Sequence, residues 1–252
     1  IAKVIRKAAV TMLDEGETEV TVTEKVLHQY LGAPRFTREL PEKEPRVGIV
    51  NGLAYTIVGG ETLEVEVNVM DGSGKLELTG NLGNVMKESV QAALSYIRAN
   101  CTALGIAPDF YKTKDIHVHF PEGAVPKDGP SAGVTVTTAI VSALTGTTVR
   151  RDVAMTGEVT LRGRVLRIGG LKEKTMAALR HGVRTVIIPA ENERDLEEID
   201  QTVRKQLNFI TARTVDTVLD AALNRPVEAP PAVLATPIAE DAAKLRRPGL
   251  QQ

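Results

Sequence analysis

The sequence has one cysteine, no tryptophan and few other aromatic residues, and each shortage removes a class of protein from consideration. With Cys101 alone, the 252-residue chain cannot hold an internal disulfide framework or a four-cysteine zinc site. With aromatics at 3%, it lacks the stacking side chains that bind single-stranded nucleic acid. A single cysteine suits a reducing compartment, so we expect a cytoplasmic protein.

Neither charge nor hydropathy indicates a nucleic-acid or membrane partner. Lys and Arg total 31 and Asp and Glu total 32, which gives a formal net charge of -1. No apolar run reaches the roughly 18 to 20 residues of a membrane helix. The chain opens with IAKVIRKAAV, without an initiator Met or a cleavable signal pattern, so we expect it to be a piece of a longer protein.

Composition and periodicity divide the chain into four segments. Residues 1–36 are expected to form a small helical unit, and the polar, proline-containing residues 37–47 a linker. Residues 48–225 alternate strand and helix patterns and are expected to form the main domain. Five of the 13 prolines fall within residues 226–252, which we interpret as a flexible tail.

Local signals predict the elements within these segments. Thr21–Glu24 fits a capping box for the second helix of the helical unit, and Asn84 is expected to cap a long helix. Asp71–Gly74 is a hairpin-turn signal between two predicted strands. Further strands are expected at 47–58, 63–70, 75–79, 115–120 and 186–189, a strand and hairpin within 152–168, a short strand near 209–212, and helices at 131–144, 171–181, 192–199 and 215–223.

Two short patterns imitate binding sites. Gly72-Ser-Gly-Lys75 contains the Gly-Lys pair of a phosphate-binding loop. Such a loop also needs Gly at position 69 and Ser or Thr at position 76, where this chain has Val and Leu, so we interpret the segment as a turn. His117 and His119 lie on one face of a predicted strand and could reach a metal ion. No third ligand is evident, which favours a structural or supporting role for them over metal binding.

Ser131 is the candidate nucleophile. Gly129-Pro-Ser131-Ala-Gly133 matches the G-x-S-x-G pattern, but a loop separates Ser131 from the preceding strand and Pro130 restricts the sharp turn that a hydrolase elbow needs. Ser131 instead opens an apolar helix, whose free N–H groups would favour an oxyanion. A classical Ser-His-Asp hydrolase that uses His181 remains the rival interpretation.

A lysine could supply the missing base. Gly169-Gly-Leu-Lys172-Glu-Lys174 carries two lysines on a predicted helix. Lowering a lysine pKa from about 10.4 by about three units requires that the ammonium be destabilised by roughly 4 kcal/mol relative to the neutral amine. Burial in an apolar pocket can supply this destabilisation. Spacing alone does not choose between Lys172 and Lys174, and most helix lysines are simply solvated.

These two segments resemble the proteolytic domain of the bacterial Lon ATP-dependent protease (LonA type). The similarity is carried by Pro126–Gly133 and Gly169–Lys174, with further matches at Gly52–Thr56, Asp115–Gly123 and Met155–Gly163. It implies an α+β fold with meander sheets and flanking helices. It also implies that the helical unit is the end of an AAA+ small helical subdomain.

The resemblance implies specific roles for residues of this chain. Ser131 would be the nucleophile and Lys174 the general base, supported by Thr156. Asp128 would be the loop acid that is linked in this family to active and inactive loop forms. Gly129, Pro130 and His117 fall within the matched motifs, and we expect supporting roles for them. Two positions depart from the family pattern: Tyr55 stands where Trp is expected, and Arg167 where Pro is expected.

The implied function is a serine endopeptidase that degrades unfolded or damaged proteins as a hexamer. This chain would need no cofactor or metal, because ATP and Mg would be used by an ATPase domain upstream. The competing hypothesis is a ring-forming assembly module that is catalytically silent without its ATPase.

Overall fold

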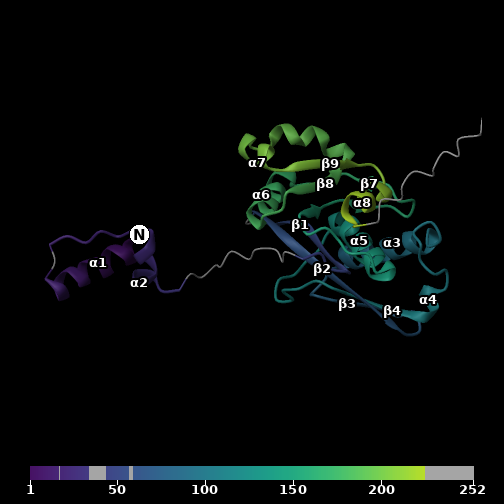
Figure 1. The fold of residues 1–252 in the computed structure, drawn as a ribbon, viewed down its shortest axis with the longest axis horizontal. Helices are drawn as coiled ribbons and strands as arrows, with labels where there is room; N and C mark the ends of the chain where they lie inside the picture. The colour runs from purple at the N-terminus through teal and green to yellow at the C-terminus, as the bar shows by residue number, and fades with distance from the viewer. Residues whose placement is uncertain (17, 34–43, 57–58, 225–252) are drawn as a thin grey trace, which may run out of the picture.

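The computed structural model describes residues 1–16, 18–33, 44–56 and 59–224 (Figure 1). The predicted linker lies mostly outside these residues, and the predicted tail wholly outside them. The helical unit consists of α1 (Ala2–Glu15), the 3-10 helix η1 (Glu24–Val26) and α2 (Leu27–Leu31). Gly16 ends α1 in the left-handed region, with φ 68°, as the sequence predicted.

The main domain is built on one mixed sheet of seven strands in the order β3-β4-β2-β1-β5-β8-β9. Antiparallel pairs join β1 to β2 and β2 to β4, and the remaining pairs are parallel. The strands are β1 (Ile49–Thr56), β2 (Gly59–Asp71), β3 (Leu76–Thr79), β4 (Lys114–His119), β5 (Val153–Met155), β8 (Thr185–Pro189) and β9 (Asn208–Ala212). A separate hairpin pairs β6 (Glu158–Val159) with β7 (Val165–Leu166).

Helices cover both faces of the central strands. They are α3 (Asn84–Ala99), α4 (Phe110–Thr113), α5 (Gly133–Thr145), α6 (Leu171–His181), α7 (Gln201–Gln206) and α8 (Val215–Ala222), with the 3-10 helices η2 (Pro130–Ala132) and η3 (Ala190–Glu198). The long central helix α5 packs against β1 and β2 and also against α3 and α8. The catalytic candidate Lys174 lies on α6, which contacts β1 and β2 as well.

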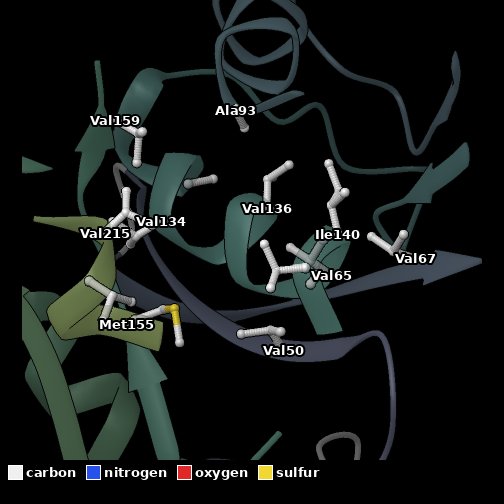
Figure 2. Close-up of a cluster of buried hydrophobic side chains, with 14 of the residues drawn as sticks. Val50, Val65, Val67, Ala93, Val134, Val136, Ile140, Met155, Val159 and Val215 are labelled. Atoms are coloured by element: carbon white, nitrogen blue, oxygen red, sulfur yellow. The ribbon is translucent and has the colours of Figure 1, made fainter. Parts of the chain in front are cut away.

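Strand alternation divides the core into two clusters. On β5, Val153 and Met155 belong to the cluster around α5, whereas Ala154 belongs to the cluster around α6. Val65 of β2 and Ile140 of α5 meet within the first cluster (Figure 2). Because side chains on one strand point into both clusters, the sheet holds α5 and α6 in fixed relation to each other.

The predicted α+β class with flanking helices is confirmed, but the connectivity is not a simple meander. Strand β4 lies between β2 and β3, so Asp71–Gly74 is a turn as predicted but joins no hairpin. The carboxylate of Asp115 on β4 accepts the N–H groups of Ser73 and Lys75, at 2.8 Å each, which fixes this turn. These backbone N–H groups of the Asp71–Gly74 turn region therefore bond to a carboxylate of the protein itself.

Two local predictions were wrong. Thr21–Glu24 forms no capping box, because no side chain caps η1 or α2. Asn84 is the first residue of α3 and Gly83 its N-cap, without a side-chain capping bond from either. The predicted helix near 192–199 is present as the 3-10 helix η3. Helix α7 was not predicted; its N-cap Asp200 accepts the N–H of Thr202 at 2.7 Å.

Candidate active site

Backbone contacts hold Ser131 at the start of α5. Its carbonyl accepts the N–H of Gly157 at 2.8 Å and the hydroxyl of Thr156 at 3.3 Å. Gly133 allows this close approach, since a Cβ there would lie 2.8 Å from the amide nitrogen of Val159. Ser131 therefore sits at the N-terminal end of the apolar helix α5, as the sequence predicted, and its carbonyl contacts the segment that follows β5.

Lys174 is the lysine that the fold turns inward. Helix α6 begins after Gly170, which is left-handed with φ 67°, and the N–H of Lys174 donates to the Gly170 carbonyl at 3.0 Å. The Lys174 residue is only 2% exposed, whereas Lys172 is exposed. Burial lowers the pKa of Lys174 from 10.5 to about 8, because the apolar surroundings disfavour the ammonium.

Three side chains from different elements converge. The Nζ of Lys174 lies 3.1 Å from the Oγ of Ser131 and 3.0 Å from the Oγ1 of Thr156. Thr156 is buried and its hydroxyl in turn donates to the Ser131 carbonyl. A neutral amine can donate one N–H to Thr156 and turn its lone pair toward the Ser131 hydroxyl, which is the arrangement that a general base needs.

The loop before Ser131 is attached to α3 through Asp128. One carboxylate oxygen of Asp128 accepts the N–H groups of Met86 and Gly129, at 2.9 Å each. Asp128 therefore caps α3 from a distant part of the chain, in the role that the sequence assigned to Asn84. Gly83 makes room for this contact, because a Cβ at that position would overlap with the Asp128 carboxylate. Pro130 follows as the first residue of η2.

His117 and His119 lie elsewhere, on β4. Their rings contact the hydroxyl of Thr79 on β3 at 2.8 Å and 2.6 Å. Neither histidine lines the cleft around Ser131. Among the described residues, no group of three or more His, Cys, Asp or Glu side chains is arranged to hold a metal ion.

His181 is at the far end of α6 from Lys174. Its Nδ1 lies 3.3 Å from the hydroxyl of Thr62 on β2. Seven residues along a helix correspond to about 10 Å of axial rise. Lys174 is the basic side chain within hydrogen-bond distance of the Ser131 hydroxyl, so the geometry favours a lysine base over a histidine base.

An open cleft of about 1360 Å³ adjoins the pair. One wall is formed by β1 and the start of β2, and another by the loop that includes residues 125–128. Ser131 and Lys174 both line it, and the residues between β7 and α6 complete the rim. The cleft is open and is lined by both apolar and polar side chains.

The two departures from the family pattern lie beside α6. The side chain of Tyr55 is 58% exposed and packs so closely on Gly170 that a Cβ there would lie 2.8 Å from its ring. Arg167 forms a 2.8 Å ion pair with Asp195 of η3. Asp195 also accepts a hydrogen bond from Asn192, a residue that the sequence analysis did not single out. No local pattern marks Asn192, because its partners are brought to it by the fold.

Comparison with known proteins assigns the chain to a family. Residues 21–225 match the family model described as the Lon protease (S16) C-terminal proteolytic domain. The chain belongs to the Lon protease family. It is 56% identical over 223 residues to Lon protease 1 of Bacillus subtilis and 54% identical over 223 residues to the Lon protease of Clostridium acetobutylicum. Each match covers 88% of this chain and 29% of the relative.

The Lon protease of Heliobacterium modesticaldum matches over the whole chain. It is 50% identical over 261 residues, which make up 32% of its own length. The chain thus spans about a third of the curated Lon relatives that it matches. The family model includes residues 21–47 as well as the predicted main domain. Within the described residues, we find no helix with both the length and the apolarity for a membrane span.

Proposed function

We propose that the chain is a serine endopeptidase that uses Ser131 and Lys174 as a catalytic dyad. The main support for this proposal is the 3.1 Å separation between the Oγ of Ser131 and the Nζ of the buried Lys174. Membership of the Lon protease family supports proteolysis as the reaction class. The dyad supplies both a nucleophile and a base whose pKa of about 8 leaves a usable neutral fraction near neutral pH.

The reaction begins when neutral Lys174 takes the Ser131 hydroxyl proton. The Ser131 oxygen then forms a bond to the scissile carbonyl carbon, and negative charge develops on the carbonyl oxygen. Amide N–H groups around Ser131 and the loop before it stabilise this oxyanion at the start of α5. The C–N bond breaks as the Lys174 ammonium returns its proton to the leaving amine.

Water completes turnover from the acyl-enzyme. Lys174 takes a proton from the water, the hydroxide oxygen bonds to the acyl carbon, and the ester bond to Ser131 breaks as its oxygen regains the proton. Thr156 keeps Nζ oriented throughout, because its hydroxyl accepts from the amine and donates to the Ser131 carbonyl. The chain needs no metal or cofactor for these steps.

We further propose unfolded or damaged proteins as the substrates and a cytoplasmic hexamer as the working form. In the full-length protein, an AAA+ domain would use ATP and Mg to feed substrates to the dyad. The open cleft and the nearly neutral chain are consistent with substrates of varied sequence. Asp128, Gly129 and Pro130 support the loop before Ser131, and Asp128 does so through its bonds to Met86 and Gly129.

The proposal is tested by cleavage of fluorescently labelled, unfolded casein. Ser131→Ala should abolish cleavage and leave the circular dichroism spectrum and thermal unfolding unchanged. Ser95→Ala is the matched control, because Ser95 is exposed on α3 and its hydroxyl bonds only within the helix. Cleavage that persists in Ser131→Ala would show that another residue is the nucleophile.

A peptidyl boronate probe separates the protease from the assembly module. Boron should bond to Ser131 in the wild-type chain and fail to do so in Ser131→Ala, with weaker labelling in Lys174→Ala. A folded hexamer that cleaves nothing and takes up no probe would favour the assembly module instead.

A further inference from the structure

Asn192 is a fully buried amide that makes three side-chain hydrogen bonds, yet it does not line the cleft. It is 0% exposed, within the 3-10 helix η3 that follows β8. Its Oδ1 accepts the N–H of Ile168 at 3.0 Å, and its Nδ2 donates to the Ile168 carbonyl at 2.9 Å. The side chain therefore pairs with both backbone groups of one residue, as a neighbouring strand would.

A third bond fixes the orientation of this amide. The Nδ2 of Asn192 also donates to the Asp195 carboxylate at 2.6 Å, and the other oxygen of Asp195 accepts from Arg167 at 2.8 Å. An amide carries an acceptor oxygen and a donor nitrogen side by side, so it can accept from the N–H of Ile168 and donate to its carbonyl at once. Arg167 and Asp195 keep the donor end of the amide turned the right way.

A short path of contacts joins Asn192 to the dyad. Ile168 is followed by Gly169 and by Gly170, the left-handed residue from which α6 starts. The Gly170 carbonyl accepts the N–H of Lys174 at 3.0 Å, so the position of this turn sets the first turn of α6. A lysine side chain has four rotatable bonds, and its Nζ stays 3.1 Å from Ser131 only if its backbone is held still.

We propose that Asn192 is a positioning residue for the general base: by clamping the backbone of Ile168, it fixes the start of α6 and so holds the Lys174 amine against Ser131 and Thr156. This inference rests on the proposed serine–lysine mechanism. Asn192 touches neither the dyad nor the cleft, so any effect that it has on the base must pass through the backbone of Ile168, which itself lies at the rim of the cleft. Loss of the clamp lets the start of α6 move and admits water to the amine, which raises the pKa of Lys174 toward its ordinary value.

The test compares Asn192→Ala with wild type in the cleavage of a fluorescence-quenched, unstructured peptide between pH 6 and 10. We expect kcat to fall about 10- to 100-fold, with KM within about threefold of wild type. The midpoint of the kcat/KM profile should move upward from about pH 8 by roughly one pH unit. Lys174 itself is followed by NMR of lysine labelled at Cε, which reports its pKa without any need for turnover.

Two further variants keep the test decisive. Asn100→Ala is the matched control, because it also removes an amide-to-backbone bond, from Nδ2 to the Tyr96 carbonyl at 2.8 Å, at the other end of the domain. It should lower the melting temperature and leave the pH midpoint unchanged. Asp195→Ala removes the carboxylate that accepts from Asn192 but leaves both bonds between Asn192 and Ile168, so this variant should fold. It should shift the midpoint of the kcat/KM pH profile upward, by less than Asn192→Ala does. If Asn192→Ala does not fold, Asp195→Ala carries the test.

The outcomes separate this inference from the mechanism on which it rests. Asn192 and Asp195 variants that fold with the wild-type kcat, KM and Lys174 pKa overturn the positioning role. A rise in KM alone also overturns it, since that would place the effect on substrate binding. If wild type cleaves nothing but Asn192→Ala still raises the Lys174 pKa in the NMR titration, the positioning stands and the proposed protease function fails.

Discussion

At the scale of single residues, the ionisation of Lys174 decides the pH dependence of the reaction. Only the neutral amine can take the Ser131 proton, and with a pKa of about 8 roughly a tenth of the molecules carry it at pH 7. We therefore expect kcat/KM to rise about tenfold between pH 7 and pH 9 and then level off. Peptide cleavage across this range measures it, and a flat profile from pH 6 to 9 would contradict a lysine base.

The same burial makes Lys174 costly to stability. Because the folded pKa lies below the unfolded value of 10.5, the unfolded chain binds the proton more tightly. The resulting loss of unfolding free energy is fully present below about pH 8, and it disappears as the pH rises from about 8 toward 10.5. Lys174→Met should then stabilise the fold at pH 7 by about 2 kcal/mol, after the lost bond to Thr156 is allowed for, while cleavage is abolished.

Denaturant unfolding at pH 7 and at pH 10 measures this difference. The gain from Lys174→Met should be larger at pH 7 than at pH 10. Lys172→Met is the matched control, since that neighbouring lysine on the same helix is exposed. An equal gain at both pH values would show that the gain comes from packing and not from ionisation.

At the scale of elements, β2 approaches the first turn of α6 at Gly60 without a side chain between the two backbones. Gly60 on β2 lies so close to α6 that a Cβ there would overlap with the carbonyl oxygen of Glu173. Gly60→Ala should push the two elements apart, destabilise the fold by about 2 kcal/mol and lower peptide cleavage with it. Denaturant unfolding and the peptide assay measure the two effects.

Gly123→Ala is the control for this prediction. Nothing lies within 4 Å of the Cβ that it would add, and no left-handed φ opposes the substitution. We expect its unfolding free energy to stay within about 0.5 kcal/mol of wild type. Equal stability of Gly60→Ala and wild type would show that the contact between β2 and α6 yields at little cost.

The elements that could be predicted from the sequence are those with a repeated local signal. The apolar spacing of α3 and the alternation of β2 predicted both elements, and their inward residues Val90 and Val65 are fully buried. The position of β4 between β2 and β3 could not be predicted, because strand pairing joins residues far apart in the chain. The cap of α3 was missed for the same reason: it comes from Asp128, more than forty residues further on.

The candidate site shows the same division between local and distant information. The chemistry of Ser131 and a nearby lysine was visible in the two motifs, but spacing left Lys172 and Lys174 open. The choice depends on which side of α6 faces Thr156, and that is decided by the packing of α6 on β1 and β2. Asn192 had no local signal at all, since its partner Ile168 is reached only through the fold.

At the scale of the whole molecule, both buried clusters belong to one part of the chain. Every buried member of the two clusters falls between Val50 and Leu223, and so do Ser131 and Lys174. A domain that contains its whole core should fold alone. We therefore predict that residues 44–224, expressed without the rest, keep the unfolding free energy of the 252-residue chain within about 1 kcal/mol.

The same shortened chain should also cleave the unstructured peptide at the wild-type rate, because all the described residues that line its cleft fall within 51–181. Denaturant unfolding and the peptide assay, run on both chains, measure the two expectations. The family match begins at residue 21, so a chain of residues 21–224 is the informative comparison. If residues 21–224 match the 252-residue chain and residues 44–224 lose several kcal/mol, residues 21–43 stabilise the protease domain and the predicted boundary at 48 is wrong.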